Sequence, residues 1–246
     1  MTKEPLHPID PSVAVLGEPG GNTRPRYASV AGSEHSTYVR DVIRPTFAAG
    51  TKFVGVADEA RATGNLMASE RGQRIEEAAQ PFVKALAAAA TAFLKQAEVT
   101  TKAWNTATVV EPFSDTAGAP LHRVLAAHEL ATRFHNMEPA QRAATLGRAI
   151  ADPKANMSWV EALLRSDDTL SGLTAQERDK LRLAALEAHA PARLAVLRVE
   201  VAQRDNARKA LADALHVLRE QSVGAAREAA IAHPEINEAI RWGEAR

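Results

Sequence analysis

The feature that most constrains the fold is an apolar stripe with helical spacing in the first half of the chain. Because an α-helix turns once in about 3.6 residues, apolar residues three or four apart share one face. Pro81 either kinks this helix or occupies its first turn, where a missing N–H needs no partner. The stripe predicts a long amphipathic helix that must pack against other helices. Its members are Ile75, Ala79, Phe82, Leu86, Ala89, Phe93, Ala97, Thr100 and Trp104.

The chain after this helix is predicted to form further helices beyond a loop at Glu111–Pro120. Two capping boxes, Ser158–Glu161 and Thr174–Glu177, mark helix starts, because a hydroxyl and a carboxylate three residues apart satisfy backbone N–H groups reciprocally. The last helix is expected to run until Pro234 stops it. The expected helices are Leu121 to His135, Pro139 to Ile150, Ser158 to about Arg165, Thr174 to about His189, and Pro191 to about Ala232.

Residues 1–68 differ in composition from the rest of the chain. Prolines and glycines recur throughout this region, which disfavours long helices. Thr37–Ile43 and Thr51–Val56 are candidate short strands. The region is interpreted either as a floppy tail or as an arm that becomes ordered against neighbouring subunits. The expected fold is therefore mainly α, with an extended Pro/Gly-rich arm (1–68) followed by an α-helical domain (69–246), a bundle with two long helices.

Composition excludes several classes of site. Hydrophobic residues make up 46% of the chain, which is enough for a core, while Lys plus Arg and Asp plus Glu both number 30, so no net field attracts nucleic acid or an anionic membrane. The absence of cysteine excludes disulfides and thiolate sites. Ala85–Leu94, the most apolar stretch, is too short to span a bilayer, and the N-terminus has no signal-peptide pattern. We expect a protein without membrane contact that is used, or assembled, in the cytoplasm.

The sequence does not contain the common catalytic and ligand-binding motifs. The segment Val13–Arg24 resembles a strand followed by a phosphate-binding turn, but Asn22 stands where a P-loop needs lysine and Pro25 disrupts the helix start. His128 and His135 lie two helical turns apart, too far to share a metal ion, and Thr132 replaces the second histidine of HExxH. The sequence predicts no catalytic residue, no metal site and no cofactor.

The segment Glu161–Leu211 resembles a pattern in helical structural and accessory proteins of tailed-bacteriophage virions. The resemblance rests on Leu170-Ser-Gly-Leu173 before the Thr174 cap, a short helix, Ala190-Pro191, and a long helix rich in alanine and charge. It covers about a fifth of the chain. It implies a virion or assembly component without catalysis, and it transfers no functional residues.

The expected function is therefore that of a non-enzymatic structural or assembly protein, a virion component assembled in the bacterial cytoplasm that acts through oligomeric contacts. The alternative is a cytoplasmic helical adaptor or regulator that binds a protein partner. Arg204 and Arg208 interrupt the apolar seam of the last long helix, as a solvated stretch or as a polar layer that fixes a partner. The candidate interaction residues are Tyr38, Val39, Val42, Phe53, Arg204, Arg208 and Trp242.

Overall fold

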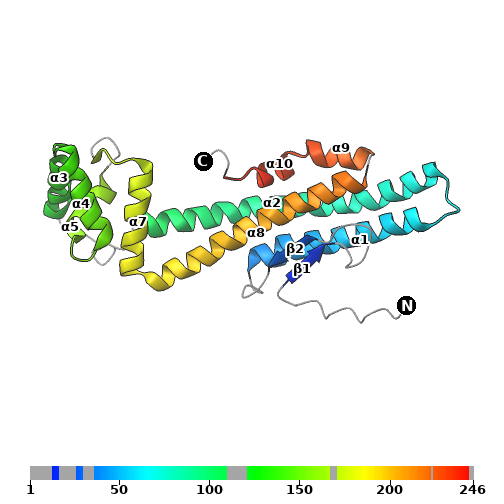
Figure 1. Cartoon of the computed structure of the whole chain (residues 1–246), viewed down its shortest axis with the longest axis horizontal. Helices are drawn as coiled ribbons and strands as arrows, with labels where there is room; N and C mark the ends of the chain where they lie inside the picture. Colours follow the sequence, from blue (N-terminus) through cyan, green and yellow to red (C-terminus); the bar gives the residue numbers. More distant parts are fainter. Residues whose placement is uncertain are drawn as a thin grey trace. The chain divides into compact units, whose positions relative to one another are not determined.

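The computed structural model is mainly α-helical and describes residues 13–16, 26–29, 36–109, 121–166, 171–222 and 224–243 (Figure 1). Two helices, α2 and α8, are much longer than the others, as the sequence predicted. The elements are β1 (Val13–Leu16), β2 (Arg26–Ser29), the π-helical turn η1 (Val39–Ile43), α1 (Arg44–Ala62), α2 (Ala68–Val109), α3 (Leu121–His135), α4 (Pro139–Ala151), α5 (Met157–Arg165), α7 (Ala175–His189), α8 (Pro191–Gln221), α9 (Ala225–Ala232) and α10 (Pro234–Ile240).

The chain divides into two compact units, with both boundaries inside long helices. Unit 1 comprises Met1–Val99 and Glu200–Arg246, and unit 2 comprises Thr100–Val199. Residues on both sides of position 68 therefore belong to unit 1. The turn that follows the strand in Val13–Arg24, the predicted loop at Glu111–Pro120 and Leu170 lie outside the described residues.

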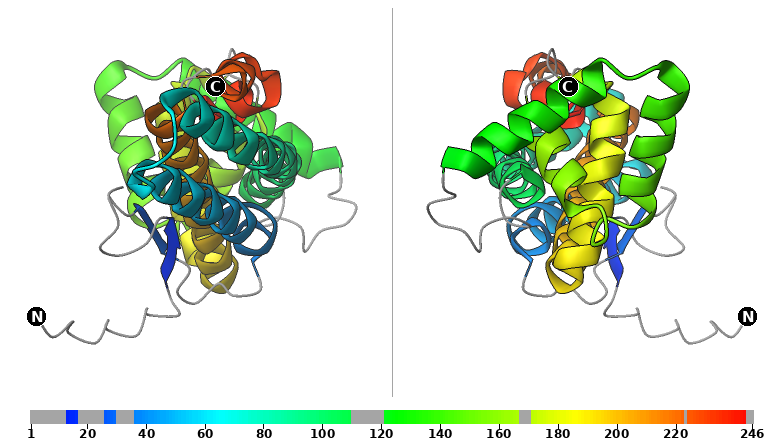
Figure 2. Two further views of the ribbon diagram at one scale, coloured as in Figure 1. Left: turned by 90° about the vertical axis from the view of Figure 1, so that its right-hand side faces the viewer. Right: turned by 90° about the vertical axis from the view of Figure 1, so that its left-hand side faces the viewer.

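The core of unit 1 forms where α1, the first part of α2, the second part of α8, and α9 and α10 pack together (Figure 2). The predicted stripe on α2 is confirmed, because its members from Ala79 to Thr100 are all buried, with Ile75 at its start and Trp104 at its end half-buried. Its alanines let neighbouring helices approach closely, while its two phenylalanines each bury a large apolar side chain. Pro81 lies inside α2 rather than at its start.

The two strands predicted at Thr37–Ile43 and Thr51–Val56 were wrong, because residues 37–62 are helical. Pro45 does not break α1, since it occupies the first turn. Gly50 does not break it either: a β-carbon there would lie 2.8 Å from the Leu16 Cδ1 and 3.1 Å from the Phe82 Cζ. The absence of a side chain at Gly50 therefore allows Leu16 and Phe82 to approach α1 closely. The part of the predicted extended arm from residue 37 to 62 is thus helical, with one face buried in the core.

A two-stranded antiparallel sheet stands at the start of unit 1. β1 pairs with β2 in the register Val13 to Ser29 and Leu16 to Arg26. Leu16 is fully buried and packs with the helical core. The hydroxyl of Thr51 on α1 donates to the Val15 carbonyl at 3.2 Å. These contacts attach the sheet to α1.

The last long helix ends earlier than predicted. α8 ends at Gln221, and α9 begins at Ala225 instead of continuing the same helix to Ala232. The Glu76 carboxylate of α2 accepts from the Ala226 N–H at 2.6 Å and from the Ser222 hydroxyl at 3.4 Å. A side chain at Gly224 would overlap this carboxylate. Glu76 of α2 therefore contacts both the residue after α8 and the first turn of α9.

Unit 2 is built from short helices around a smaller core. Phe134, Leu163 and Leu181 of α3, α5 and α7 are buried at its centre. The capping box of Thr174 and Glu177 is confirmed at the start of α7. The one predicted at Ser158 was wrong, since α5 has Asn156 at its N-cap position and Ser158 in its first turn. Asn156 donates to the carbonyls of Arg148 and Asp152, and so joins the end of α4 to the start of α5.

Candidate functional site: apolar surfaces and two pockets

Four predicted contact residues lie in the core of unit 1. Tyr38, Val39, Val42 and Phe53 are at most 2% exposed. The Tyr38 ring lies 6.0 Å from that of Phe93. These side chains pack within the chain itself, and their segment is helical, so it does not offer a strand to a neighbour's sheet.

The remaining predicted contact residues lie in the second segment of unit 1, Glu200–Arg246. Trp242 packs edge-to-face on Phe93, with ring centroids 6.3 Å apart at 90°. Arg204 pairs with Asp205 at 3.1 Å, and Arg208 donates to the Ile240 carbonyl at 3.5 Å. The polar interruption of the α8 seam thus places one arginine against the end of α10.

An exposed apolar surface lies on the N-terminal part of α8, in unit 2. It consists of Ala192, Ala195, Val196 and Val199, which we call the α8 apolar stripe. Val196 is 59% and Val199 52% exposed. Their spacing of three and four residues places them on one helix face. The sequence shows the same spacing. However, neighbouring apolar residues form the buried face of α8, and the pattern alone does not tell which of the two faces is exposed.

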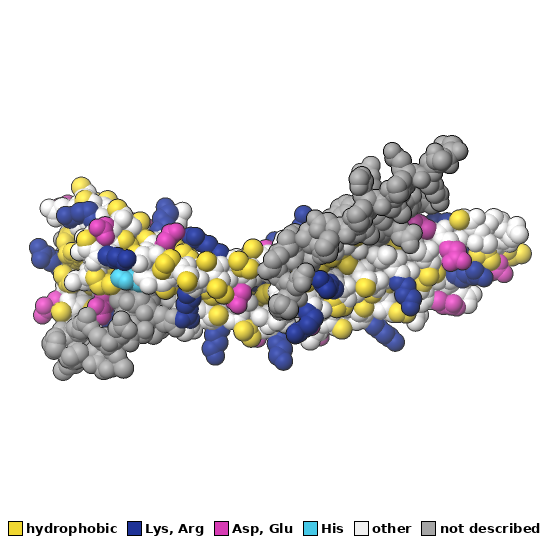
Figure 3. All heavy atoms as spheres, turned by 90° about the horizontal axis from the view of Figure 1, so that it is seen from below, with side chains coloured by type: hydrophobic (Ala, Val, Ile, Leu, Met, Phe, Trp, Pro, Cys, Tyr) yellow, Lys and Arg dark blue, Asp and Glu magenta, His cyan; other side chains and the backbone are white. Residues whose placement is uncertain are grey.

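The other face of the same part of α8 is buried. Leu194 and Leu197 pack with Leu186 of α7 and Ala107 of α2. This part of α8 is therefore apolar on two faces, and only one of them is covered within the described residues. On the face seen in Figure 3, hydrophobic side chains lie between Lys and Arg side chains.

A cleft in unit 1 lies between α1 and α2 beside Pro81. Its volume is about 200 Å³. Its floor is the stacked pair Phe53 and Phe82, with ring centroids 5.4 Å apart. Proline has no N–H, so Pro81 cannot donate to the Glu77 carbonyl one turn earlier. The cleft is apolar, with Lys52 at its rim.

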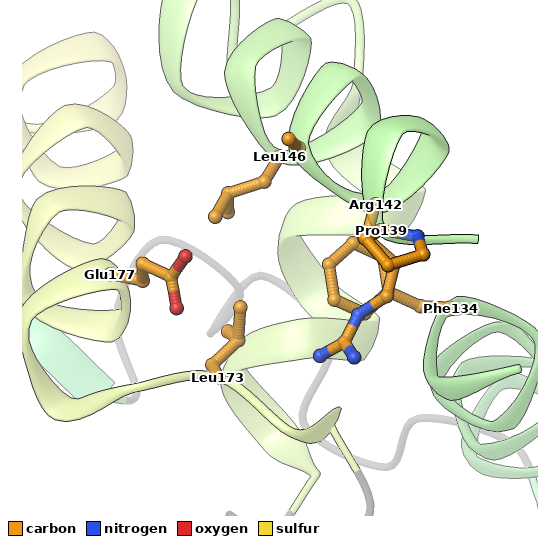
Figure 4. Close-up of a pocket in the computed structure, with 7 residues that line it drawn as sticks. Phe134, Pro139, Arg142, Leu146, Leu173 and Glu177 are labelled. Carbon is orange, nitrogen blue, oxygen red and sulfur yellow. The ribbon is translucent and has the colours of Figure 1, made fainter. Parts of the chain in front are cut away.

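A second pocket lies within unit 2, between α4 and α7, and we call it the α4–α7 pocket (Figure 4). Its volume is about 160 Å³. Figure 4 shows the Arg142 guanidinium and the Glu177 carboxylate approaching one space from different helices, with Leu146 and Leu173 between them. Its lining residues are Phe134, Pro139, Arg142, Ala143, Leu146, Leu173 and Glu177.

The two charged groups of this pocket are held in place by their neighbours. The Arg142 guanidinium carbon lies 5.3 Å from the Phe134 ring centroid, and its Nη2 donates to the Gly172 carbonyl at 2.9 Å. Gly172 has φ of 60°, and a β-carbon there would lie 2.8 Å from that nitrogen. The pKa of Glu177 is lowered, first by the Thr174 N–H and then by the Thr174 hydroxyl, with a smaller effect of Arg142.

Arg178 supports the loop before α7, and the sequence pattern did not reveal it. It is 7% exposed. Its Nη1 donates to the Ser166 carbonyl at 3.0 Å and its Nη2 to the Ser171 hydroxyl at 2.9 Å. The guanidinium thereby joins both ends of the segment between α5 and α7. An arginine in a charge-rich helix gives no sequence signal for such burial.

Metal-binding and membrane-spanning features are absent from the described residues. They contain no group of three or more His, Cys, Asp or Glu side chains placed to hold a metal ion. None of the helices within that part of the chain combines the length and apolarity needed to cross a bilayer. The chain has no significant match among family models, curated proteins or solved structures.

Proposed function

We propose that the chain is a non-enzymatic structural or assembly protein that acts through contacts between copies of itself and with neighbouring proteins. The α8 apolar stripe carries this proposal. Valines exposed by more than half on one helix face leave apolar area in water that a second helix would bury. The structural basis of such a function is a helix surface rather than a catalytic centre.

The stripe has the composition of a helix-packing surface. Ala192 and Ala195 allow two helix backbones to approach closely, while Val196 and Val199 supply the buried area. The Arg198–Glu187 ion pair, 3.7 Å long, lies beside the stripe and gives it a polar rim. If both copies use the same stripe, the contact buries four valines, two from each copy, and each contributes about 1 kcal/mol. We therefore infer a symmetric contact between two α8 helices.

Sedimentation velocity of the full-length protein tests this contact. We expect the unaltered protein to sediment as an oligomer, and the double variant Val196→Glu, Val199→Glu to sediment as a monomer with an unchanged helical circular dichroism spectrum. Thr91→Glu is the control, since it adds a charge at another exposed helix position. A monomeric unaltered protein, or a double variant that remains oligomeric, would show that the stripe is not a self-association surface.

The place of this function is proposed to be a tailed-bacteriophage virion, assembled in the host cytoplasm. The resemblance of Glu161–Leu211 to virion proteins supports this assignment. The alternative is a cytoplasmic helical adaptor, which the apolar cleft beside Pro81 favours, because such a cleft suits a side chain of a different protein. Mass spectrometry of purified particles distinguishes the two: a virion component is present there in stoichiometric amounts, and an adaptor is absent.

A further inference from the structure

The α4–α7 pocket contains one cationic and one anionic side chain, and each has hydrogen-bonding atoms that bind no described residue. Arg142 uses Nη2 for the Gly172 carbonyl and forms no ion pair with any described residue. Glu177 uses Oε2 for the Thr174 N–H at 2.9 Å and the Thr174 hydroxyl at 2.7 Å. Its Oε1 has no hydrogen bond within the described part of the protein. A ligand therefore meets fixed donors from one helix and a fixed acceptor from another.

The space between these groups is apolar and small. Leu146 and Leu173 lie between the two charged groups in Figure 4, and the Phe134 ring lies beside Arg142. Pockets for drug-sized molecules start at roughly 300 Å³. A volume of about 160 Å³ suits one apolar side chain rather than a nucleotide or a large cofactor.

The charges also select the ligand. Arg142 and Glu177 together have no net charge, so the pocket does not favour a ligand with a strong charge of either sign. A peptide unit has a C=O that accepts and an N–H that donates, and it is neutral. Its polarity matches a pocket with a donor on one side and an acceptor on the other.

We propose that the α4–α7 pocket binds a short internal peptide segment of a partner protein. One apolar side chain enters between Leu146 and Leu173, a backbone carbonyl accepts from Arg142, and a backbone N–H donates to Glu177. The site is distinct from the α8 apolar stripe and goes beyond self-association, because it defines the chemistry by which a different polypeptide is recognised.

Nuclear magnetic resonance titration of the full-length protein tests this proposal with N-acetyl-leucine amide, a neutral peptide unit with one apolar side chain. We expect saturable shifts of the Leu146 and Leu173 methyl signals with a dissociation constant of about 1 mM, as befits so small a ligand. N-acetylglycine amide lacks the side chain and should not saturate. No saturable shift with the leucine probe would overturn the proposal.

Charged probes test the neutrality of the ligand. N-acetyl-leucine places a carboxylate near Glu177, and leucine amide places an ammonium group near Arg142. We expect each to bind several-fold more weakly than the neutral probe. Tighter binding of N-acetyl-leucine would show that the pocket receives the terminal carboxylate of a polypeptide instead, which would contradict the proposal of an internal segment.

Two neighbouring alanines of α4 provide a matched pair of variants. Ala143→Phe places a ring at the pocket lining, whereas Ala144→Phe places it at an exposed position outside the lining. Both alanines are exposed, so both variants should fold. We expect loss of saturable binding in the first and unchanged binding in the second. Equal binding by the two variants would contradict the proposal.

Arg142→Gln and Glu177→Gln test the hydrogen bonds. Each variant should bind the neutral probe about five-fold more weakly, which corresponds to the loss of one hydrogen bond. Glutamine also serves in a capping box, so Glu177→Gln retains the start of α7. Unchanged binding in both variants would rule out the proposed backbone contacts. The Val196→Glu, Val199→Glu variant should bind the probe normally, so a failure of one proposal is distinguishable from a failure of the other.

Discussion

The polar contacts that hold unit 1 together join residues far apart in the sequence, whereas those of unit 2 join residues that are closer. Glu76 and Ala226 are 150 positions apart, and Arg61 and Gln221 are 160 positions apart. In unit 2 the Thr174–Glu177 contact spans 3 positions and the Arg178–Ser166 contact 12. Unit 1 therefore depends on bringing distant segments of the chain together.

The two hydrophobic cores show the same difference. The core of unit 1 includes Leu16 from the first strand and Trp242 from the segment after α10. The core around Phe134 in unit 2 is drawn from α3, α4, α5, α7 and the loop residue Leu173. Because non-local contacts require more conformational entropy to be lost before they form, we expect the contacts of unit 1 to form later in folding. Three substitutions test how far this contrast extends to stability.

The largest effect is expected for Phe93→Ala in unit 1. The ring is fully buried and contacts both Tyr38 and Trp242, so its loss leaves a cavity among segments from distant parts of the sequence. The free energy of unfolding should fall by about 4 kcal/mol, measured by urea denaturation with circular dichroism. Phe134→Ala in unit 2 is the comparison. It should cost less, because Phe134 already lines a pocket; an equal or larger loss would contradict the contrast.

An intermediate effect is expected for Gly224→Ala. The new β-carbon would displace the Glu76 carboxylate from the Ala226 N–H and break the contact between α9 and α2. The free energy of unfolding should fall by about 2 kcal/mol. The backbone φ of −98° at Gly224 suits alanine, so the loss would come from the contact and not from strain. Glu76→Ala should cost a similar amount, and the double variant should cost little more than either. Additive losses would show that the two residues act separately.

The smallest effect is expected in the capping box of unit 2. Thr174→Ala removes the hydroxyl that accepts from the Glu177 N–H at 3.2 Å. The free energy of unfolding, measured by thermal denaturation, should fall by about 1 kcal/mol. A loss as large as that of Gly224→Ala would mean that this local contact carries more of the fold than its short span suggests.

The Glu177 carboxylate adds a pH dependence to the same cap. Its pKa is lower in the folded protein than in the unfolded one, so its contribution is complete above the ordinary glutamate range and is lost as pH falls through the lowered pKa. The stability difference between the unaltered protein and Glu177→Gln should therefore shrink on acidification. It should be small, because the carboxylate is largely solvated. A difference that grows towards acid pH would contradict this sign.

Several elements could be predicted from the sequence because their causes are local. The α2 stripe follows from residue spacing alone, and the Thr174 cap follows from two side chains three positions apart. Pro139 and Pro191 marked the starts of α4 and α8, since proline fits the first turn of a helix. The spacing of the α8 apolar stripe is equally local, but its exposure is not, because only packing decides which of two apolar faces is covered.

Other features were mispredicted where a tertiary contact overrides the local pattern. Thr37–Ile43 and Thr51–Val56 were assigned strands because prolines and glycines recur around them, yet the buried residues Phe47, Phe53, Val54 and Ala57 lie on one helical face. Leu16 and Phe82 pack against Gly50 and leave no room for a side chain, which explains a glycine at this position of a helix. The pocket residues Arg142 and Glu177 lie 35 positions apart, and no spacing rule connects them.

The sequence by itself determined that this protein is mainly helical, which face of α2 is buried, where α7 begins, and that no cysteine chemistry is open to it. These properties depend on composition, side-chain periodicity and caps, which act within a few residues. Only the tertiary structure decided that residues 37–62 join the core, that Glu76 accepts from the first turn of α9, and that Arg142 and Glu177 share one pocket. These outcomes depend on which distant segments pack together, and that choice is made by the fit of whole surfaces.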